Sequence, residues 1–190
     1  MKSRYLKIGL FLLMLLSLFS CNNSKKEIRV IVDKYYHSLK KGDLDQMLNL
    51  FSFDIKLSYD NLYQQNPELK TFTSDTLKIV GSSFDYEIEK VKIKDNKAVV
   101  TIKETGLDKE MLDKKIKELT SKESFIPSNN NDFEKAKKEF VDYQMNILSQ
   151  AVKEVKEKKS SATTLTLEKE KSGWVITTKN LLRVNPKDEI

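Results

Sequence analysis

The spacing of apolar residues is helical from residue 28 onwards, where such side chains recur every three or four positions. This spacing predicts an amphipathic helix, and its inward positions are Ile28, Ile31, Val32, Tyr35 and Leu39. Lys40-Lys41-Gly42 predicts the end of the helix, because glycine readily adopts the left-handed conformation that terminates helices. Asp43 predicts the N-cap of a second helix, with Gln46 completing a capping-box pattern.

The segment from 54 to 83 shows no clear period. Asn61–Gln65 predicts a short helix, and Pro67 predicts a break close to it.

Residues 84–104 predict a β-hairpin whose first strand is irregular. Phe84, Tyr86 and Ile88 alternate, whereas Val91 and Ile93 alternate one step out of phase. A β-bulge near Glu89-Lys90 would bring both halves onto one face. The turn is predicted at 94–97, because its Asp and Asn tolerate left-handed geometry.

Two further helices are predicted between residues 108 and 158. Asp108 caps the first, and its expected inward residues are Met111, Leu112, Ile116 and Leu119. After a loop at 127–131, one apolar stripe runs from Asp132 to about Lys158, which implies burial against a sheet or a partner helix. Its members are Phe133, Ala136, Phe140, Tyr143, Ile147, Leu148, Ala151, Val152 and Val155.

A second hairpin is predicted at the end of this region. Ala162–Glu170 forms one strand, 171–173 the turn and Trp174–Thr178 the returning strand. The order of elements predicts a single α+β domain over 27–184, with an antiparallel sheet packed on helices and a helical insert at 108–158.

The first twenty residues predict an export signal. Basic residues up to Lys7 precede an apolar stretch, Ile8–Phe19. A helix of about twelve residues covers roughly 18 Å, well short of the ~30 Å hydrocarbon core of a membrane. We therefore expect a signal peptide over 1–20 that is removed, followed by a polar tether over 21–26.

Residues 18–21 resemble the lipobox of bacterial lipoproteins. Leu18 stands at −3, Ser20 at −1 and Cys21 at +1, whereas Phe19 departs from the smaller residue preferred at −2. The resemblance implies a lipid on the Cys21 thiol and, often, an acyl chain on the new amine. Two or three acyl chains anchor a protein stably. We expect an extracytoplasmic protein held on a membrane, at the cell surface or in the periplasm.

Composition excludes several other functions. The chain has 34 Lys and Arg against 28 Asp and Glu, and loss of three cations with the signal peptide leaves a net charge of about +3. So small and mixed a charge does not indicate nucleic-acid binding. Cys21 is the only cysteine, so no disulfide forms within the chain.

Few residues suggest catalysis. His37 is the only histidine, which excludes a metal site built on several histidines, and phosphate-binding and zinc-protease motifs are missing. We expect neither metal nor cofactor. Tyr35, Tyr36 and Trp174 are candidates for lining a ligand pocket, although large aromatic residues more often belong to a core.

Three segments together resemble the NTF2-like, or cystatin-like, lipoprotein domains of bacteria. Tyr35–Asp43 is similar to the first helix and its Lys-Gly-Asp corner, Val91–Thr101 to the central hairpin, and Lys171–Ile176 to the closing strand. The resemblance implies a curved sheet that wraps a helix into a cone. Such a cone holds a ligand, forms a dimer surface or is filled with side chains. The insert at 108–158 departs from a minimal domain of this kind.

Three functions remain open from the sequence. We favour a non-enzymatic binding or interaction domain, held at a membrane by its lipid, with a protein or a small apolar ligand as partner. The first alternative is an enzyme that uses His37 and a carboxylate in the cone for acid/base chemistry. The second is a structural envelope protein that oligomerises through the stripe at 132–158.

Overall fold

The computed structural model describes residues 23–128 and 132–178 of the chain. The signal peptide, Cys21 and the segment after 178 lie outside the described residues. The N-terminal helix occupies residues 23–41 and so includes most of the predicted tether. The labelled elements that follow are α2 (Leu44–Leu48), α3 (Phe53–Gln65), α4 (Pro67–Gly81), β1 (Asp85–Lys94), β2 (Lys97–Leu107), α5 (Lys109–Lys122), α6 (Phe133–Glu154), β3 (Lys158–Glu170) and β4 (Gly173–Ile176).

The N-terminal helix ends at Gly42, as the sequence predicts. Gly42 has a φ of +66°, and its N–H donates to the Leu39 carbonyl at 3.1 Å. The Asp43 N–H donates to the Ser38 carbonyl at 2.9 Å, which completes a Schellman motif. Asp43 also caps α2, because its Oδ1 accepts the N–H of Gln46 at 3.0 Å.

The segment from 54 to 83 forms two full helices, where the pattern predicted only a short one at 61–65. The break near Pro67 is correct, since Pro67 opens α4 directly after α3 ends. The apolar pattern does not predict these helices because few of their positions are buried. The buried residues are Ile55 and Tyr63 in α3, and Gly81 in α4. A helix with so few inward residues shows little periodicity.

The four strands form one antiparallel sheet in the order β1-β2-β3-β4. The predicted bulge is confirmed by a register shift between Ile88 and Lys90, and Asp95 in the turn has a φ of +55°. β3 starts at Lys158 rather than Ala162, because the long β2 pairs along its whole length, up to Leu107 with Lys158.

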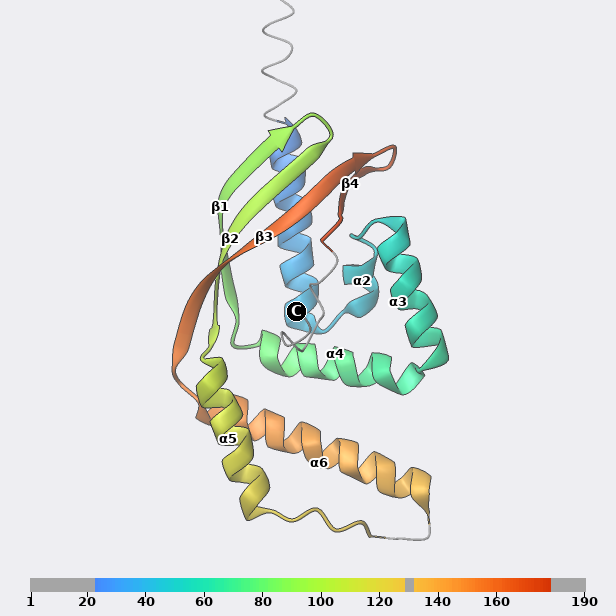
Figure 1. The fold of residues 1–190 in the computed structure, drawn as a ribbon, viewed down its shortest axis with the longest axis vertical. Coiled ribbons are helices and arrows are strands. Elements are labelled where there is room, and N and C mark those ends of the chain that lie inside the picture. Colours follow the sequence, from blue (N-terminus) through green and yellow to red (C-terminus); the bar gives the residue numbers. More distant parts are fainter. Residues whose placement is uncertain (1–22, 129–131, 179–190) are drawn as a thin grey trace, which may run out of the picture.

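The main core lies between the sheet and the N-terminal helix. Figure 1 shows β1, β2 and β3 curving around this helix, with α2 and α3 on its other side and α4 running across its C-terminal end. β4 is tied to the chain after α2 by a parallel bridge between Phe51 and Ile176. The fold class is thus α+β, with a curved antiparallel sheet packed on helices. The inward residues of β2, β3 and β4 are Ala98, Val100, Ile102, Leu165, Leu167, Trp174 and Ile176.

The insert at 108–158 consists of α5 and α6, which form a second, small cluster around Leu119, Ile147 and Ala151. Three predicted inward residues are instead exposed: Met111 (38%), Phe133 (76%) and Phe140 (42%). Helical spacing shows which residues share a face, but only a packing partner buries that face. The first half of α6 extends past the residues that α5 covers. α6 also ends at Glu154 rather than near Lys158.

Candidate functional site

Tyr35 and Tyr36 are buried in the main core, with exposed fractions of 2% and 0%. Their rings meet edge to face, with centroids 5.0 Å apart. Tyr36 also stacks on Tyr86, at 4.2 Å between centroids, and on Phe84, at 5.7 Å. Of the two interpretations left open for Tyr35 and Tyr36, this arrangement agrees with side chains that fill the interior of the sheet.

A carboxylate enters this aromatic cluster from β2. The Tyr36 hydroxyl donates to Glu104 Oε1 at 2.5 Å. Burial raises the pKa of Glu104, although the hydrogen bond from Tyr36 opposes the rise. Burial also raises the pKa of Tyr36, and the bond to Glu104 adds to the rise. The pair therefore consists of a neutral phenol and a carboxyl group that retains its proton to higher pH than usual.

The sequence analysis missed Glu104, although a usable signal was present. Ala98, Val100 and Ile102 alternate inwards on β2, and the next inward position is Glu104. A carboxylate that continues an apolar alternation indicates either a buried partner or a functional group. A similar pair lies closer to the surface, where the Tyr86 hydroxyl donates to Asp33 at 2.7 Å.

His37 lies on the exposed side of the N-terminal helix, between the buried residues Tyr36 and Ser38. Within the described parts of the chain, no hydrogen bond or ion pair joins it to a carboxylate. Glu104, the carboxylate inside the sheet, pairs with Tyr36 instead. The structure therefore does not bring together the His37–carboxylate pair on which the acid/base alternative depends.

Trp174 lies beside an open hollow at one end of the molecule. Residues 23–29, the β1–β2 turn at 92–97 and the β3–β4 turn at 168–173 meet here, and we call this the turn end. The hollow has a volume of about 640 Å³, and its walls come from residues 26–31 and 169–174. Trp174 is 5% exposed, and its buried Nε1 has no hydrogen-bond partner among the described residues. Of the sequence candidates, Trp174 is therefore the one at the edge of a cavity.

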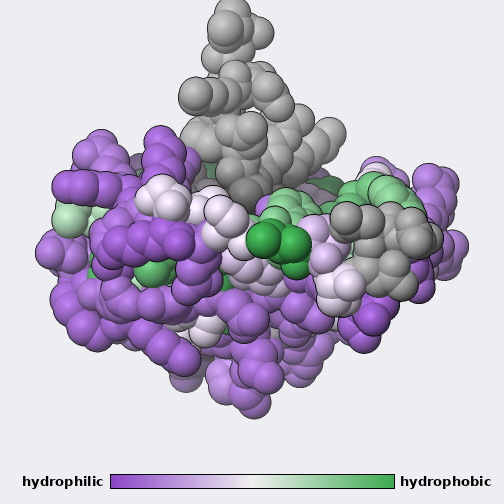
Figure 2. All heavy atoms as spheres, turned by 90° about the horizontal axis from the view of Figure 1, so that it is seen from below, coloured by the Kyte–Doolittle hydropathy of each residue, from purple (hydrophilic) through white to green (hydrophobic). Residues whose placement is uncertain are grey.

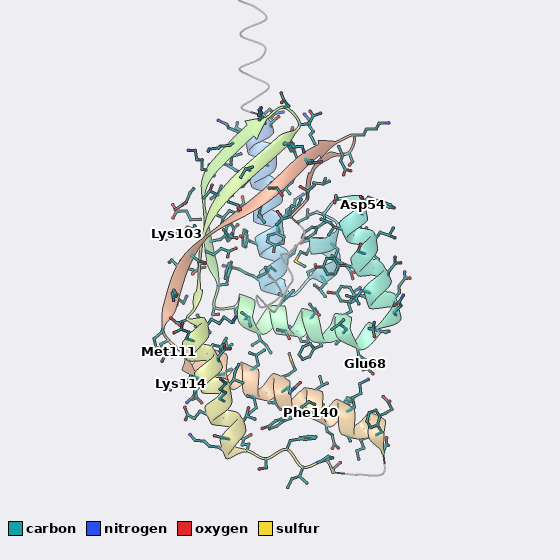
Figure 3. The ribbon with its side chains drawn as sticks, viewed as in Figure 1. Asp54, Glu68, Lys103, Met111, Lys114 and Phe140 are labelled. Carbon is teal, nitrogen blue, oxygen red and sulfur yellow. The ribbon has the colours of Figure 1, made fainter. Side chains whose placement is uncertain are left out.

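The opposite end of the molecule carries exposed apolar side chains on α5, on α6 and on the segment that follows α5. We call this the helical end. Ile126 is 81% exposed, and Phe133 and Phe140 are exposed as stated above. Figure 2 views this end and shows apolar atoms on a mainly hydrophilic surface, and Figure 3 places Phe140 on α6 and Met111 on α5. Phe125 packs on Phe140 with centroids 5.3 Å apart, so the Phe140 ring has one partner within the described chain.

Among the residues that the structure covers, no three His, Cys, Asp or Glu side chains are placed to hold a metal ion. Over the same residues, no helix combines the length and the apolar character that a membrane span requires.

Comparison with known proteins gave structural likenesses at low sequence identity, of which two are described below. No family model matches the chain, and no curated protein matches it. A crystal structure described as a "putative dehydratase from the NTF2-like family", from Streptomyces avermitilis, is 10% identical with a TM-score of 0.40, covering 82% of this chain and 92% of its own. A "putative lipoprotein (ycdA)" from Bacillus subtilis is 15% identical with a TM-score of 0.36. That match covers 63% of this chain and 37% of the lipoprotein.

Proposed function

We propose that this protein is a lipoprotein, held at an extracytoplasmic membrane surface by Cys21, whose domain binds a protein partner through its helical end. The apolar side chains exposed on that end carry the proposal. Phe133 and Phe140 belong to one stripe of α6, yet Phe133 is 76% exposed and Phe140, which contacts Phe125 on one side, is still 42% exposed. Burying one phenylalanine side chain in an interface stabilises a complex by about 1.5–3 kcal/mol.

The position of the anchor agrees with this role. The first described residue of the N-terminal helix is residue 23, and two residues of chain span at most about 7 Å. A lipid on Cys21 would therefore hold the turn end close to the membrane. Figure 1 shows α5 and α6 at the other end of the long axis, so the helical end would face away from the membrane towards a partner.

The anchor is tested by mass spectrometry of the mature protein beside a Cys21→Ser variant. We expect the wild-type chain to begin at Cys21 and to carry the added mass of acyl chains, and the variant to lack that mass. A wild-type chain without lipid, or with another first residue, would overturn the anchoring.

The partner surface is tested by photo-crosslinking in living cells. A photoreactive phenylalanine analogue replaces Phe133 in one variant and Phe53 in the other. Phe53 is a matched control, because it is 69% exposed but lies on α3. We expect a discrete adduct from position 133 that position 53 does not form. Equal adducts at both positions, or none at 133, would contradict the proposal.

The same crosslinking experiment distinguishes the oligomer alternative from binding of a different protein. An adduct of twice the chain mass would identify a second copy of the protein as the partner. An adduct of another mass supports the binding domain. The exposed half of the α6 stripe keeps the oligomer alternative open, because that half does not pack on its own sheet.

A further inference from the structure

The turn end brings three separate segments together at the start of the N-terminal helix. The N–H of Lys169 donates to the carbonyl of Asn96 at 2.8 Å, which joins the two turns. The helix start and the β3–β4 turn share the hollow beside Trp174. Figure 1 shows the helix start and both hairpin turns at one end of the long axis. The three segments therefore form one continuous surface.

This surface is basic, whereas the rest of the described chain is not. Residues 23–29, 92–97 and 168–173 contain eight Lys and Arg against four Asp and Glu, a net charge of +4. The remaining described residues contain 20 basic and 22 acidic side chains, a net charge of −2. The eight basic residues of the turn end are all exposed. Among the described residues, the turn end is thus distinctly more basic than the rest.

The hollow at this end combines cations with apolar side chains. Lys26, Lys169 and Lys171 line it together with Val30 and Trp174, and two glutamates offset part of their charge. Lys169 Nζ lies 6.0 Å from the centre of the Trp174 ring. Exposed lysines suit the boundary between lipid headgroups and water, because their aliphatic stems can lie against apolar atoms while their charged ends reach the phosphate groups.

We propose that the turn end docks on the surface of the membrane that holds the anchor, with its lysines in contact with the phosphate groups of anionic phospholipids. The inference rests on the proposed lipid at Cys21, because the lipid brings these charges within reach of the surface. At physiological salt the Debye length is about 8 Å, comparable to the ~7 Å reach of the two residues after Cys21. The charges therefore orient an anchored domain rather than recruit a free one.

The test uses the mature lipidated protein on vesicles of phosphatidylcholine alone, or with about one third phosphatidylglycerol. A water-soluble acylating reagent modifies exposed lysines, and mass spectrometry gives the rate at each position. Lys94, Lys169 and Lys171 should react about fivefold more slowly on the anionic vesicles, the factor that one lysine contributes near such a surface. Lys114 and Lys117 on α5 are the internal control and should react equally on both. Figure 3 marks Lys114 at the helical end.

Two variants and a salt arm make the test specific. In the triple variant Lys94→Glu/Lys169→Glu/Lys171→Glu, the remaining turn-end lysines should be acylated equally fast on both kinds of vesicle. A matched triple variant, Lys109→Glu/Lys114→Glu/Lys117→Glu, changes net charge equally and should keep the slower acylation on anionic vesicles. About 1 M NaCl, where the Debye length falls to about 3 Å, should remove the difference between vesicles. Circular dichroism confirms that both variants fold.

The outcomes separate the docking from the anchor. Flotation of the vesicles in a density gradient shows whether the protein is bound to them. If the protein floats with both kinds of vesicle but its lysines are acylated at equal rates on both, the docking is overturned and the anchor still holds. Protein that floats with neither kind overturns the anchor and, with it, the docking.

Discussion

Tyr36 and Glu104 show how one polar pair is accommodated inside an aromatic core. The Tyr36 ring is fully buried between other aromatic rings, so its hydroxyl needs a partner within the fold. Glu104 supplies that partner from the last inward position of the β2 alternation. Each member of the pair therefore explains the burial of the other.

Tyr36→Phe should destabilise the protein by about 1–3 kcal/mol, because the half-buried Glu104 then loses its hydrogen-bond donor. Urea unfolding followed by circular dichroism measures the change. Tyr86→Phe is the matched control: it removes a hydroxyl bonded to the exposed Asp33 and should cost less than about 1 kcal/mol. Equal costs for the two variants would show that burial of the pair does not matter.

Glu104 should also give stability a distinctive pH dependence. Burial raises the pKa of Glu104 in the folded state above the ordinary glutamate value of 4.5, so the folded protein retains a proton that the unfolded chain releases. The contribution of Glu104 to stability therefore declines as pH rises from 4.5 through its folded pKa.

Comparing wild type with Glu104→Gln isolates this effect, because other carboxylates titrate alike in both proteins. The free energy of unfolding of wild type minus that of the variant should be largest near pH 4.5 and decrease towards pH 7. A difference that is constant, or that grows with pH, would contradict the raised pKa.

At the scale of elements, the turn at Gly42 between the N-terminal helix and α2 was predictable, because it depends only on residues that are adjacent in the sequence. A left-handed residue after basic residues, followed by a capping aspartate, can be read from four adjacent positions. The sequence could not show that α4 packs against this turn, where a Cβ on Gly42 would lie 2.3 Å from the Ser74 carbonyl oxygen. That contact joins segments far apart in the chain.

Gly42→Ala should therefore cost more than the left-handed conformation alone. A side chain in this conformation costs about 1–2 kcal/mol, and the clash with the backbone of α4 adds to it, so we expect at least about 2 kcal/mol in chemical unfolding. Gly106→Ala is the control, since a Cβ there meets only the Phe84 ring at 3.4 Å. A loss of only about 1–2 kcal/mol at Gly42 would mean that α4 moves aside and that the left-handed conformation accounts for the whole effect.

The apolar stripe of α6 marks a second limit of sequence reasoning. The stripe was correct as a periodicity, but burial depends on how much of the stripe a partner covers, and the second half of the helix is covered more fully than the first. Ile147 and Ala151 are buried, while Phe133 is exposed. For the same reason the sequence did not predict α3 and α4 in full, because their few buried positions leave little apolar periodicity.

The two halves of α6 should respond differently to substitution. Phe133→Ser should leave the free energy of unfolding within about 0.5 kcal/mol of wild type, because the side chain already faces water. Ile147→Ala should cost about 2–5 kcal/mol through the lost core contacts. Thermal and urea unfolding of both variants measure this. A large loss at Phe133 would show that its ring packs within the monomer.

At the scale of the whole molecule, the two ends differ in chemistry. The turn end is basic and the helical end displays apolar side chains, with the sheet and the N-terminal helix between them. The sequence predicted the fold class from the order of helices and hairpins, and the anchor from the pattern around Cys21, which lies outside the described residues. The clustering of charge was invisible in the sequence, because the three basic segments are widely separated along the chain.

The bridge between Phe51 and Ile176 bears on when this chain folds. The N–H of Ser52 donates to the carbonyl of Ile176 at 2.9 Å, and the N–H of Ile176 donates to Leu50 at 2.8 Å. The first part of the chain is thus completed by its last strand, and such non-local pairing folds slowly. A ribosome must release nearly the entire chain before the core can close. For the export proposed above, delayed closure would favour passage through a channel that admits unfolded polypeptide.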